Sequence, residues 1–293
     1  MAKGKATVNL EYAALRFFCG LVRLVPYAAA MALADALGWF GAAVVGFKRR
    51  RTLDRLRTVF PELDEPARRR IARRSLQGFL RTVIELIKVG RFGREWFQRH
   101  VPESAKYKAI LQGLVDEGRG VVIMVPHTGN WYMPAWAMAF EGLPLFAIAA
   151  RQRNPKIDAW LKRQYGGIEV LDRDCRDTLG GIRDRLRAGQ VFAILPDLRV
   201  RKRDVEADFL RGKANVSRAG AMFAVRTGAP IVVAAMRRDE QGRHLIEHLA
   251  TLRPEGRTAE DLTREALARL SDFILAHPAD WYWYNKRWVL EPV

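Results

Sequence analysis

The chain has 293 residues, and its 50 Lys and Arg against 32 Asp and Glu give a formal net charge of +18. A chain of this length buries a sizeable core and forms one large domain, or a domain with an appendage. Such a positive charge favours an anionic partner, which is nucleic acid, an acidic membrane surface or an acidic soluble substrate. The two cysteines, Cys19 and Cys175, are far apart and outside any C-x-x-C pair, which argues against a disulfide framework or a zinc knuckle.

The first predicted element is an apolar segment over residues 10–47. Residues 24–47 alone are long enough to cross a bilayer as a helix. Pro26, the charged interruptions and the Ala and Gly content also suit a helix that lies in the membrane interface. The segment ends in four basic residues, 48–51, which by the positive-inside tendency belong on the cytoplasmic face. We therefore expect residues 1–51 to be a membrane-anchoring helical segment, spanning or in-plane.

Two further helices are predicted around the Pro-rich turn at residues 61–66. The second carries an apolar stripe at helical spacing, formed by Leu76, Phe79, Leu80, Val83, Ile84, Leu86 and Ile87. Just before the stripe lie five arginines, Arg68, Arg69, Arg70, Arg73 and Arg74. A charge run of this kind is typically a solvated helix face, but beside a membrane anchor it also suits anionic headgroups.

After residue 101 the pattern alternates between strand and helix. Strands are predicted at 121–125, 145–149, 191–195 and 231–236, and helices near 105–116, 155–165, 178–188, 217–227 and 262–276. This alternation predicts an α/β fold with a mostly parallel or mixed sheet flanked by helices. We expect this part, with a helical lead-in at 52–100, to form one domain over residues 52–293.

Polar side chains follow three of the predicted strands. His127 follows the first, Arg151 and Arg153 follow the second, and Asp197 follows the third. In open α/β sheets ligands bind at the carboxyl ends of strands, so a base, an acid and two cations there predict an active site. A histidine at this place can take a proton from a hydroxyl near neutral pH. Strand-end polar residues also arise simply because the chain must leave the sheet.

Several ordered motifs together resemble the bacterial lipid A biosynthesis acyltransferases, a family that includes late lauroyl and myristoyl transferases. They are His-Thr-Gly-Asn-Trp at 127–131, Arg-Gln-Arg-Asn-Pro at 151–155, Leu-Pro-Asp at 195–197, Arg-Thr-Gly-Ala-Pro at 226–230, Trp-Tyr-Trp-Tyr-Asn-Lys-Arg-Trp at 281–288 and Phe-Pro-Glu-Leu at 60–63. The likeness covers nearly the whole chain. It implies a glycerolphosphate acyltransferase-like fold at the cytoplasmic face of a bacterial inner membrane.

The resemblance also implies a reaction and its residues. A fatty acyl group would pass from acyl carrier protein or acyl-CoA to a hydroxyl of a lipid A precursor or a related lipid, with no bound cofactor or metal. His127 matches the family base and Asp197 the aspartate of the Leu-Pro strand, while Arg151 matches the family arginine, with Arg153 as a rival. Substrate contacts are expected from Gly129, Asn130, Trp131, Arg153, Asn154 and Arg199.

One position departs from the family pattern. In the family the histidine is followed, after four intervening residues, by an aspartate or glutamate. This chain has Tyr132 at that position. Tyrosine is neutral near pH 7 and balances an imidazolium poorly. Three explanations are open: Tyr132 orients His127 itself, another carboxylate such as Asp197 or Glu141 reaches the ring, or the chain binds lipid without turning it over.

The expected partners are inner-membrane lipids and acyl carrier protein. The carrier is acidic, so the cluster Arg199, Arg201, Lys202 and Arg203 suits its docking or a lipid phosphate, unless it is a solvated loop. Binding of nucleic acid is not expected, because it leaves the apolar first 47 residues unexplained and no helix-turn-helix, RRM or zinc-finger signature occurs.

Overall fold

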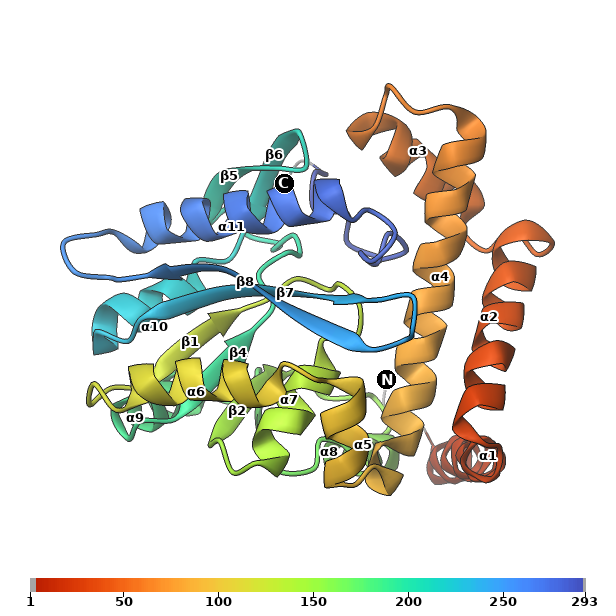
Figure 1. The fold of residues 1–293 in the computed structure, drawn as a ribbon, viewed down its shortest axis with the longest axis horizontal. Coiled ribbons are helices and arrows are strands. Elements are labelled where there is room, and N and C mark those ends of the chain that lie inside the picture. Colours follow the sequence, from red (N-terminus) through yellow and green to blue (C-terminus); the bar gives the residue numbers. More distant parts are fainter. Residues whose placement is uncertain (1–3, 292–293) are drawn as a thin grey trace.

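The computed structural model describes residues 4–291. The first three residues of the predicted 1–51 segment and the last two of the predicted 52–293 domain therefore lie outside the described part. At the centre is a six-stranded sheet in the order β3-β2-β4-β1-β7-β8 (Figure 1). Its strands are β1 (Val121–Met124), β2 (Leu145–Ala149), β3 (Glu169–Asp172), β4 (Val191–Ile194), β7 (Ile231–Arg238) and β8 (His244–Leu252). Only β8 runs antiparallel, which confirms the predicted α/β class with a mostly parallel sheet.

Helices cover both faces of the sheet (Figure 1). Alternate residues of β1 enter two different cores: Val122 and Met124 face one, and Val121 and Ile123 face the other. The first core includes α9 (Thr178–Arg187), α10 (Ala219–Thr227), α11 (Ala259–Ala276) and the hairpin of β5 (Val205–Phe209) and β6 (Gly212–Val216). The second includes α5 (Arg94–His100), α6 (Ser104–Val115) and α7 (Tyr132–Phe140). Burial of β1 on both faces explains its unbroken apolar sequence.

The amino-terminal segment forms two helices. Helix α1 (Lys5–Leu24) stops before Pro26, and α2 (Tyr27–Ala43) starts after it. A residue that precedes proline is disfavoured in the helical conformation, so the chain breaks at Val25. Within the range 24–47 the structure thus has one shorter helix, Tyr27–Ala43, and the membrane attachment expected of residues 1–51 stays a prediction. Across residues 4–291, every helix falls short of the length or the apolar character needed to cross a membrane.

The predicted helix pair around residues 61–66 is confirmed as α3 (Arg49–Val59) and α4 (Glu65–Lys88). The Asp64 side chain accepts a 2.7 Å hydrogen bond from the backbone N–H of Ala67 and so caps α4. Helix α4 lies between the α1–α2 pair and the sheet (Figure 1), and the stripe residues Ile84 and Ile87 are buried against that pair. The short helix α8 (Pro155–Gln164) also contacts α1.

Candidate active site

The register of two neighbouring strands brings His127 and Asp197 together. Strands β1 and β4 are parallel, and Met124 is the register partner of Ile194. His127 and Asp197 each follow these partners by three residues, and each comes after a Val-Pro or Leu-Pro pair. The two side chains therefore leave the sheet at the same level.

The two residues are joined by two hydrogen bonds. Asp197 Oδ1 lies 2.7 Å from Nδ1 of the His127 ring, and Oδ2 accepts the backbone N–H of His127, also at 2.7 Å. The carboxylate is fully buried, whereas the imidazole keeps 18% of its side-chain surface exposed. Burial pushes the pKa of Asp197 upward, but the His127 ring, the indole of Trp281 and the backbone N–H of His127 together hold this pKa below its usual value.

This arrangement fixes the proton on the ring. A buried carboxylate only accepts hydrogen bonds, so Nδ1 carries the proton that it donates to Asp197. The lone pair of the neutral imidazole is then on Nε2, which can accept a proton from a hydroxyl. Of the two carboxylates predicted as ring partners, Asp197 makes this contact, while Glu141 ends α7 and offers its backbone carbonyl to Lys108.

The carboxyl-terminal segment holds in place the histidine loop, which is the stretch 125–131 between β1 and α7. The indole Nε1 of Trp281 donates to Asp197 Oδ2 at 2.8 Å, and the backbone N–H of Tyr282 donates to the carbonyl of His127 at 3.1 Å. Thr128 also forms a β-bridge with Trp281. Trp281 was not among the predicted site residues. Its aromatic-rich surroundings in the sequence were a signal, but nothing there indicated which indole would face the carboxylate.

Gly129 is required by the backbone of this loop. Its φ of +53° lies in the left-handed region, and a Cβ built there would sit 2.9 Å from the carbonyl oxygen of Met236. Both observations favour glycine. Its carbonyl accepts the hydroxyl of Thr82 on α4, and its N–H donates to the carbonyl of Asp280. Gly129 thus lets the loop pass close to β7.

An apolar cavity of about 540 Å³ opens beside the His127 ring. Its volume falls within the range of about 300–1,000 Å³ that is usual for ligand pockets. Most of its walls are aliphatic or aromatic; they include Val125, Trp131, Tyr132, Ala135, Leu145, Ala147, Ile148, Tyr165, Ile168, Val170, Ile182, Ala193, Ile194, Leu195 and Phe223. Three arginines, Arg173, Arg199 and Arg287, also line it. The cavity can take a long apolar chain next to cationic groups.

Tyr132 lines this cavity and contacts three aromatic side chains. Its ring stacks on Trp136 with centroids 5.4 Å apart, and its phenol interacts with Trp131 and Tyr165. Burial raises the pKa of the phenol, which is therefore neutral near pH 7. Trp131 contacts the His127 ring edge-on, with the two ring centroids 4.9 Å apart. Among the predicted site residues, His127, Trp131, Tyr132 and Arg199 thus line one cavity.

The two arginines after β2 lie elsewhere. The Arg151 side chain is 72% exposed and pairs with Asp172 at the end of β3. Arg153 is also exposed. Neither residue lines the cavity in the described structure.

Asn130 is fully buried and both ends of its amide are engaged. Its Oδ1 accepts the backbone N–H of Tyr132 at 3.0 Å, and its Nδ2 donates to Glu85 on α4 at 2.7 Å. Glu85 is also fully buried and accepts two hydrogen bonds from Arg238 at 2.9 and 2.8 Å, and one from Tyr27 of α2 at 2.7 Å. Although burial raises the pKa of Glu85, Arg238 and His244 lower it well below its usual value.

Asn154 is buried at the junction of α8 and α1. Its Oδ1 accepts the backbone N–H groups of Lys156 and Ile157, which caps α8. Its Nδ2 donates to Glu11 and to the carbonyl of Val8 in α1. These contacts use the side chain within the fold, away from the cavity.

Known proteins resemble this chain over 44% to 69% of its length. Phosphatidylinositol mannoside acyltransferase of Mycobacterium tuberculosis strain H37Rv is 26% identical over 221 residues, which are 69% of this chain and 68% of that protein. The Mycolicibacterium smegmatis protein of the same name is 26% identical over 62% of this chain and 60% of its own length. Lipid A biosynthesis acyltransferase 2 of Shigella flexneri is 30% identical over 44% of this chain and 41% of that protein.

A family model gives the broadest match. The model described as bacterial lipid A biosynthesis acyltransferase matches residues 5–289, which is nearly the whole chain and includes both partners of the His127–Asp197 pair. The fold, the paired histidine and carboxylate, and this match agree with one another. The chain is an acyltransferase that belongs to the bacterial lipid A biosynthesis acyltransferase family.

Proposed function

We propose that this protein moves a fatty acyl group from acyl carrier protein or acyl-CoA to a hydroxyl of a lipid A precursor or a related lipid, with His127 as general base. The observation that supports it most strongly is the hydrogen-bonded His127–Asp197 pair beside an apolar cavity. Both donors are thioesters, so the same chemistry serves either of them.

In the proposed reaction Nε2 of His127 takes the proton of the acceptor hydroxyl while its oxygen attacks the thioester carbonyl carbon. The carbon–sulfur bond then breaks, the new ester stays on the acceptor, and the imidazolium returns its proton to the leaving thiolate. Asp197 keeps the ring in the required tautomer and balances the positive charge that forms on it. Trp281 and the backbone N–H of His127 hold this carboxylate in its ionised form.

The cavity supports an acyl chain as its occupant. Its aliphatic walls suit the chain of the thioester, and the imidazole at its edge meets the carbonyl carbon. Arg173, Arg199 and Arg287 suit phosphate groups of the donor or of an anionic acceptor. The neighbouring residues Arg201 and Lys202 are exposed, as is Arg203, and they suit an acidic carrier protein.

Membrane attachment is proposed for the α1–α2 pair. Large apolar side chains stand exposed on it and on the loop that follows: Leu10, Phe17, Phe18, Leu21, Leu24, Leu33, Leu37, Trp39, Phe40, Val44, Val45 and Phe47. An apolar surface of this extent suits helices that lie in the interface of a bilayer. With the basic residues 48–51 beside it, we assign the protein to the cytoplasmic face of a bacterial inner membrane.

The alternative is a lipid-binding protein without turnover, and it depends on the neutral Tyr132. Asp197 supplies a carboxylate to the ring in place of that residue, which favours turnover. Asn130 and Asn154 are proposed as positioning residues rather than substrate contacts, because their side chains are already bonded within the fold.

The test is acyl transfer from labelled acyl carrier protein, and in parallel from labelled acyl-CoA, to total lipid extract of the source membranes. A labelled lipid should form with the natural protein, and His127→Ala should reduce its rate by about 10²–10⁴. A labelled product that forms equally well with His127→Ala would contradict the proposed base. No product from either donor, with lipid still bound, would favour the lipid-binding alternative. If the exposed basic loop docks the carrier, the carrier-dependent rate should fall steeply with salt; a salt-independent rate would contradict that docking.

A further inference from the structure

The junction of α2, α3 and α4 holds a second, separate groove of about 300 Å³. Its floor is apolar and includes Ala42, Leu53 and Ala72. Four arginines line it: Arg49, Arg69, Arg70 and Arg73. No acidic residue of the described chain lines this groove, and it shares no lining residue with the cavity at His127.

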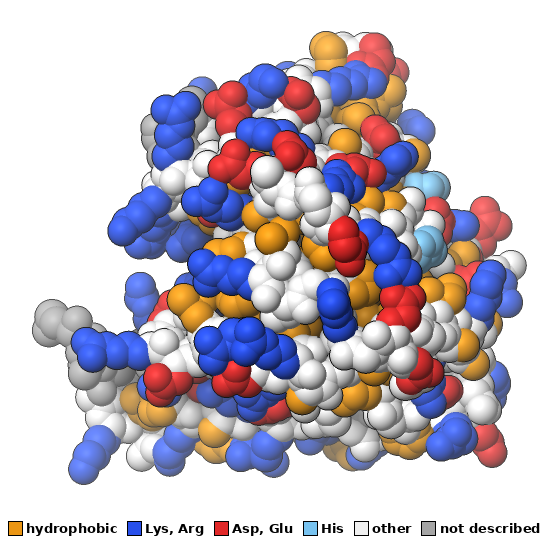
Figure 2. Space-filling view, turned by 90° about the vertical axis from the view of Figure 1, so that its left-hand side faces the viewer, with side chains coloured by type: hydrophobic (Ala, Val, Ile, Leu, Met, Phe, Trp, Pro, Cys, Tyr) orange, Lys and Arg blue, Asp and Glu red, His pale blue; other side chains and the backbone are white. Residues whose placement is uncertain are grey.

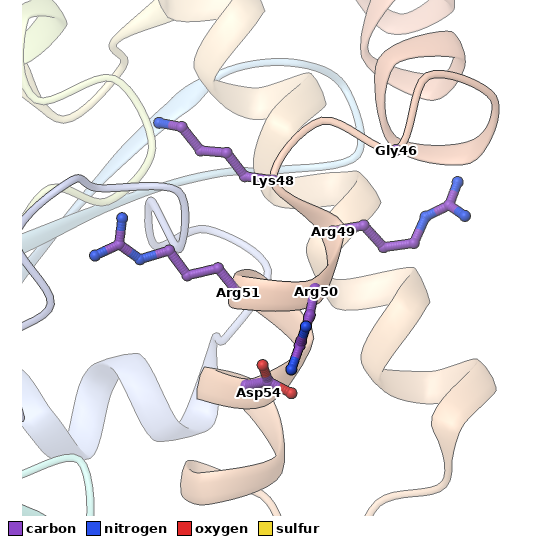
Figure 3. Close-up of a pocket in the computed structure, with 6 residues that line it drawn as sticks. All are labelled: Gly46, Lys48, Arg49, Arg50, Arg51 and Asp54. Atoms are coloured by element: carbon purple, nitrogen blue, oxygen red, sulfur yellow. The ribbon is translucent and has the colours of Figure 1, made fainter.

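Three of the four basic residues at 48–51, where α3 begins, point in two directions. Lys48 and Arg51 point toward the carboxyl-terminal segment (Figure 3), where they donate to the carbonyls of Tyr284 and Lys286. Arg49 points the other way (Figure 3) and donates to the carbonyls of Ala42 and Ala43 at the end of α2. These three cations therefore fasten the loop, and only Arg49 of the three lines the groove.

Two of the three groove arginines on α4 have no partner among the described residues 4–291. Nε of Arg69 lies 3.5 Å from a carboxylate oxygen of Glu65. Arg70 and Arg73 make no hydrogen bond or ion pair with any residue of the described range 4–291. Elsewhere the surface charge is mixed: Figure 2 shows Lys and Arg interspersed with Asp and Glu on the face away from the α1–α2 pair. Two unpaired guanidinium groups over a groove without acids favour an anion.

The surroundings of the groove indicate where that anion comes from. In the segment 40–47, which precedes Arg49, four large apolar residues are exposed to solvent. Their exposed fractions are 50% for Phe40, 57% for Val44, 65% for Val45 and 42% for Phe47. Apolar side chains this exposed beside cations are typical of a surface that meets lipid, where the chains enter the interface and the cations meet the headgroups. Guanidinium groups also match phosphate oxygens with two parallel hydrogen bonds.

We propose that the groove between α2, α3 and α4 binds the phosphate of an anionic lipid headgroup in the membrane, with Arg70 and Arg73 as its principal ligands. This inference rests on the proposed membrane attachment of the α1–α2 pair, and it is independent of the acyl-transfer chemistry. The bound headgroup orients the protein on the bilayer, since most residues that line the groove belong to α2, α3 and α4, and these helices lie on the same side of the fold as α1 (Figure 1).

The test measures binding of the full-length protein to vesicles of phosphatidylcholine alone and to vesicles in which part of it is replaced by phosphatidylglycerol. Each basic residue near an anionic surface strengthens binding about fivefold, so Arg70→Gln with Arg73→Gln should weaken binding to the anionic vesicles about 30-fold. Binding to phosphatidylcholine alone should stay as in the natural protein. The matched control, Arg183→Gln with Arg187→Gln, removes the same charge from exposed positions on α9 and should change binding less than about threefold.

The outcomes distinguish failure of the proposed groove site from failure of the membrane attachment on which it depends. Equal losses in both double variants would overturn the groove, because they would show a response to net charge alone. If the natural protein bound neither vesicle, the proposed attachment would fail together with the groove. Inorganic phosphate alone is the remaining arm: if it raised the melting temperature of the natural protein but not of the Arg70 and Arg73 variant, while both bound anionic vesicles equally, a soluble phosphate would replace the lipid assignment.

Discussion

Asp197→Asn should remove most of the acyl-transfer activity while the fold stays intact. In the natural protein Oδ2 accepts two N–H groups, from the His127 backbone and the Trp281 indole, and Oδ1 accepts only the ring Nδ1. The single oxygen of asparagine is best placed against the two donors, so its NH₂ group faces the ring. Nδ1 must then accept a hydrogen bond, and the ring proton moves to Nε2. A ring protonated at Nε2 cannot accept the proton of the acceptor hydroxyl.

The expected size of the effect follows from this exchange of donor and acceptor. The same substitution in a serine-protease triad reduces kcat about 10⁴-fold through the wrong tautomer. We expect a fall of about 10³–10⁴ in kcat here, with KM changed less than about threefold, because the carboxylate does not line the cavity. Two of the three hydrogen bonds keep their direction and the third is reversed, but all three lose the charge of the carboxylate, so the loss in unfolding free energy should be about 1.5–3 kcal/mol.

The assay is the initial rate of thiol release from acyl-CoA or acyl carrier protein in the presence of lipid acceptor, with the melting temperature as a check on folding. Tyr132→Phe is the matched comparison, since it removes the hydroxyl at the position where the family has its carboxylate. Its rate should fall less than about tenfold, because a neutral phenol contributes little charge balance. A nearly active Asp197→Asn beside an inactive Tyr132→Phe would refute the assignment of Asp197 as the partner of the ring.

Four further predictions concern the cavity, the indole, the buried cluster and the dependence of stability on pH. Ala147→Leu adds volume to the cavity wall and should shift the preferred acyl chain to a shorter one, as competition between labelled donors of different length would show. Trp281→Phe removes one hydrogen bond to a buried carboxylate and should reduce kcat about tenfold and the unfolding free energy by about 1–3 kcal/mol, measured by urea titration. Glu85→Gln leaves Arg238 buried without its charge partner and should cost about 3–5 kcal/mol in the same titration. The pKa values of Glu85 and Asp197 lie below their usual range, so the stability that these carboxylates add is complete above about pH 5 and is lost as the pH falls further. The urea midpoint of the natural protein should therefore drop in acid. The midpoint of Glu85→Gln should drop less, because one of the two carboxylates is absent.

The main strands and the ends that bear polar residues could be predicted from the sequence. Two apolar runs each close with a proline and a polar residue, His127 and Asp197, and this shared pattern identified both. The adjacency of their strands could not be predicted, because β4 follows β1 only after two other strands, and the sheet order depends on how crossovers pack. The choice between Asp197, Glu141 and Tyr132 as the ring's partner therefore needed the structure.

The elements that the sequence did not predict have weak local signals. The edge strand β3 is only four residues long and begins and ends with an acidic residue. Helix α7 has Pro134 in its first turn, which obscures a helical pattern in a short apolar stretch. The β5–β6 hairpin turns through Leu210 and Arg211, both at positive φ, where a hairpin is normally recognised from glycine or asparagine.

The sequence also carries a signal for Glu85. It is an acidic residue within Val83, Ile84, Leu86 and Ile87, and a charge in a buried stripe must have a partner. The identity of that partner was not predictable, since Arg238 lies 153 positions away on another element. The partners of Asn130 were unpredictable for the same reason: a polar residue beside His127 suggests a substrate contact, and only the fold shows that its amide bonds Glu85 and the backbone of Tyr132.

The same buried cluster changes how the amino-terminal helices relate to the site. Tyr27 of α2 and Asn130 of the histidine loop both donate to the Glu85 carboxylate, each at 2.7 Å. Asn130 in turn accepts the backbone N–H of Tyr132. Tyr132 and Ala135 both line the cavity. One carboxylate thus connects the apolar helices to the loop that carries His127. Because a buried charge is stable only with all its partners in place, correct packing of α2 and correct placement of the loop are energetically coupled. The amino-terminal pair is therefore a support of the site as well as the proposed membrane contact.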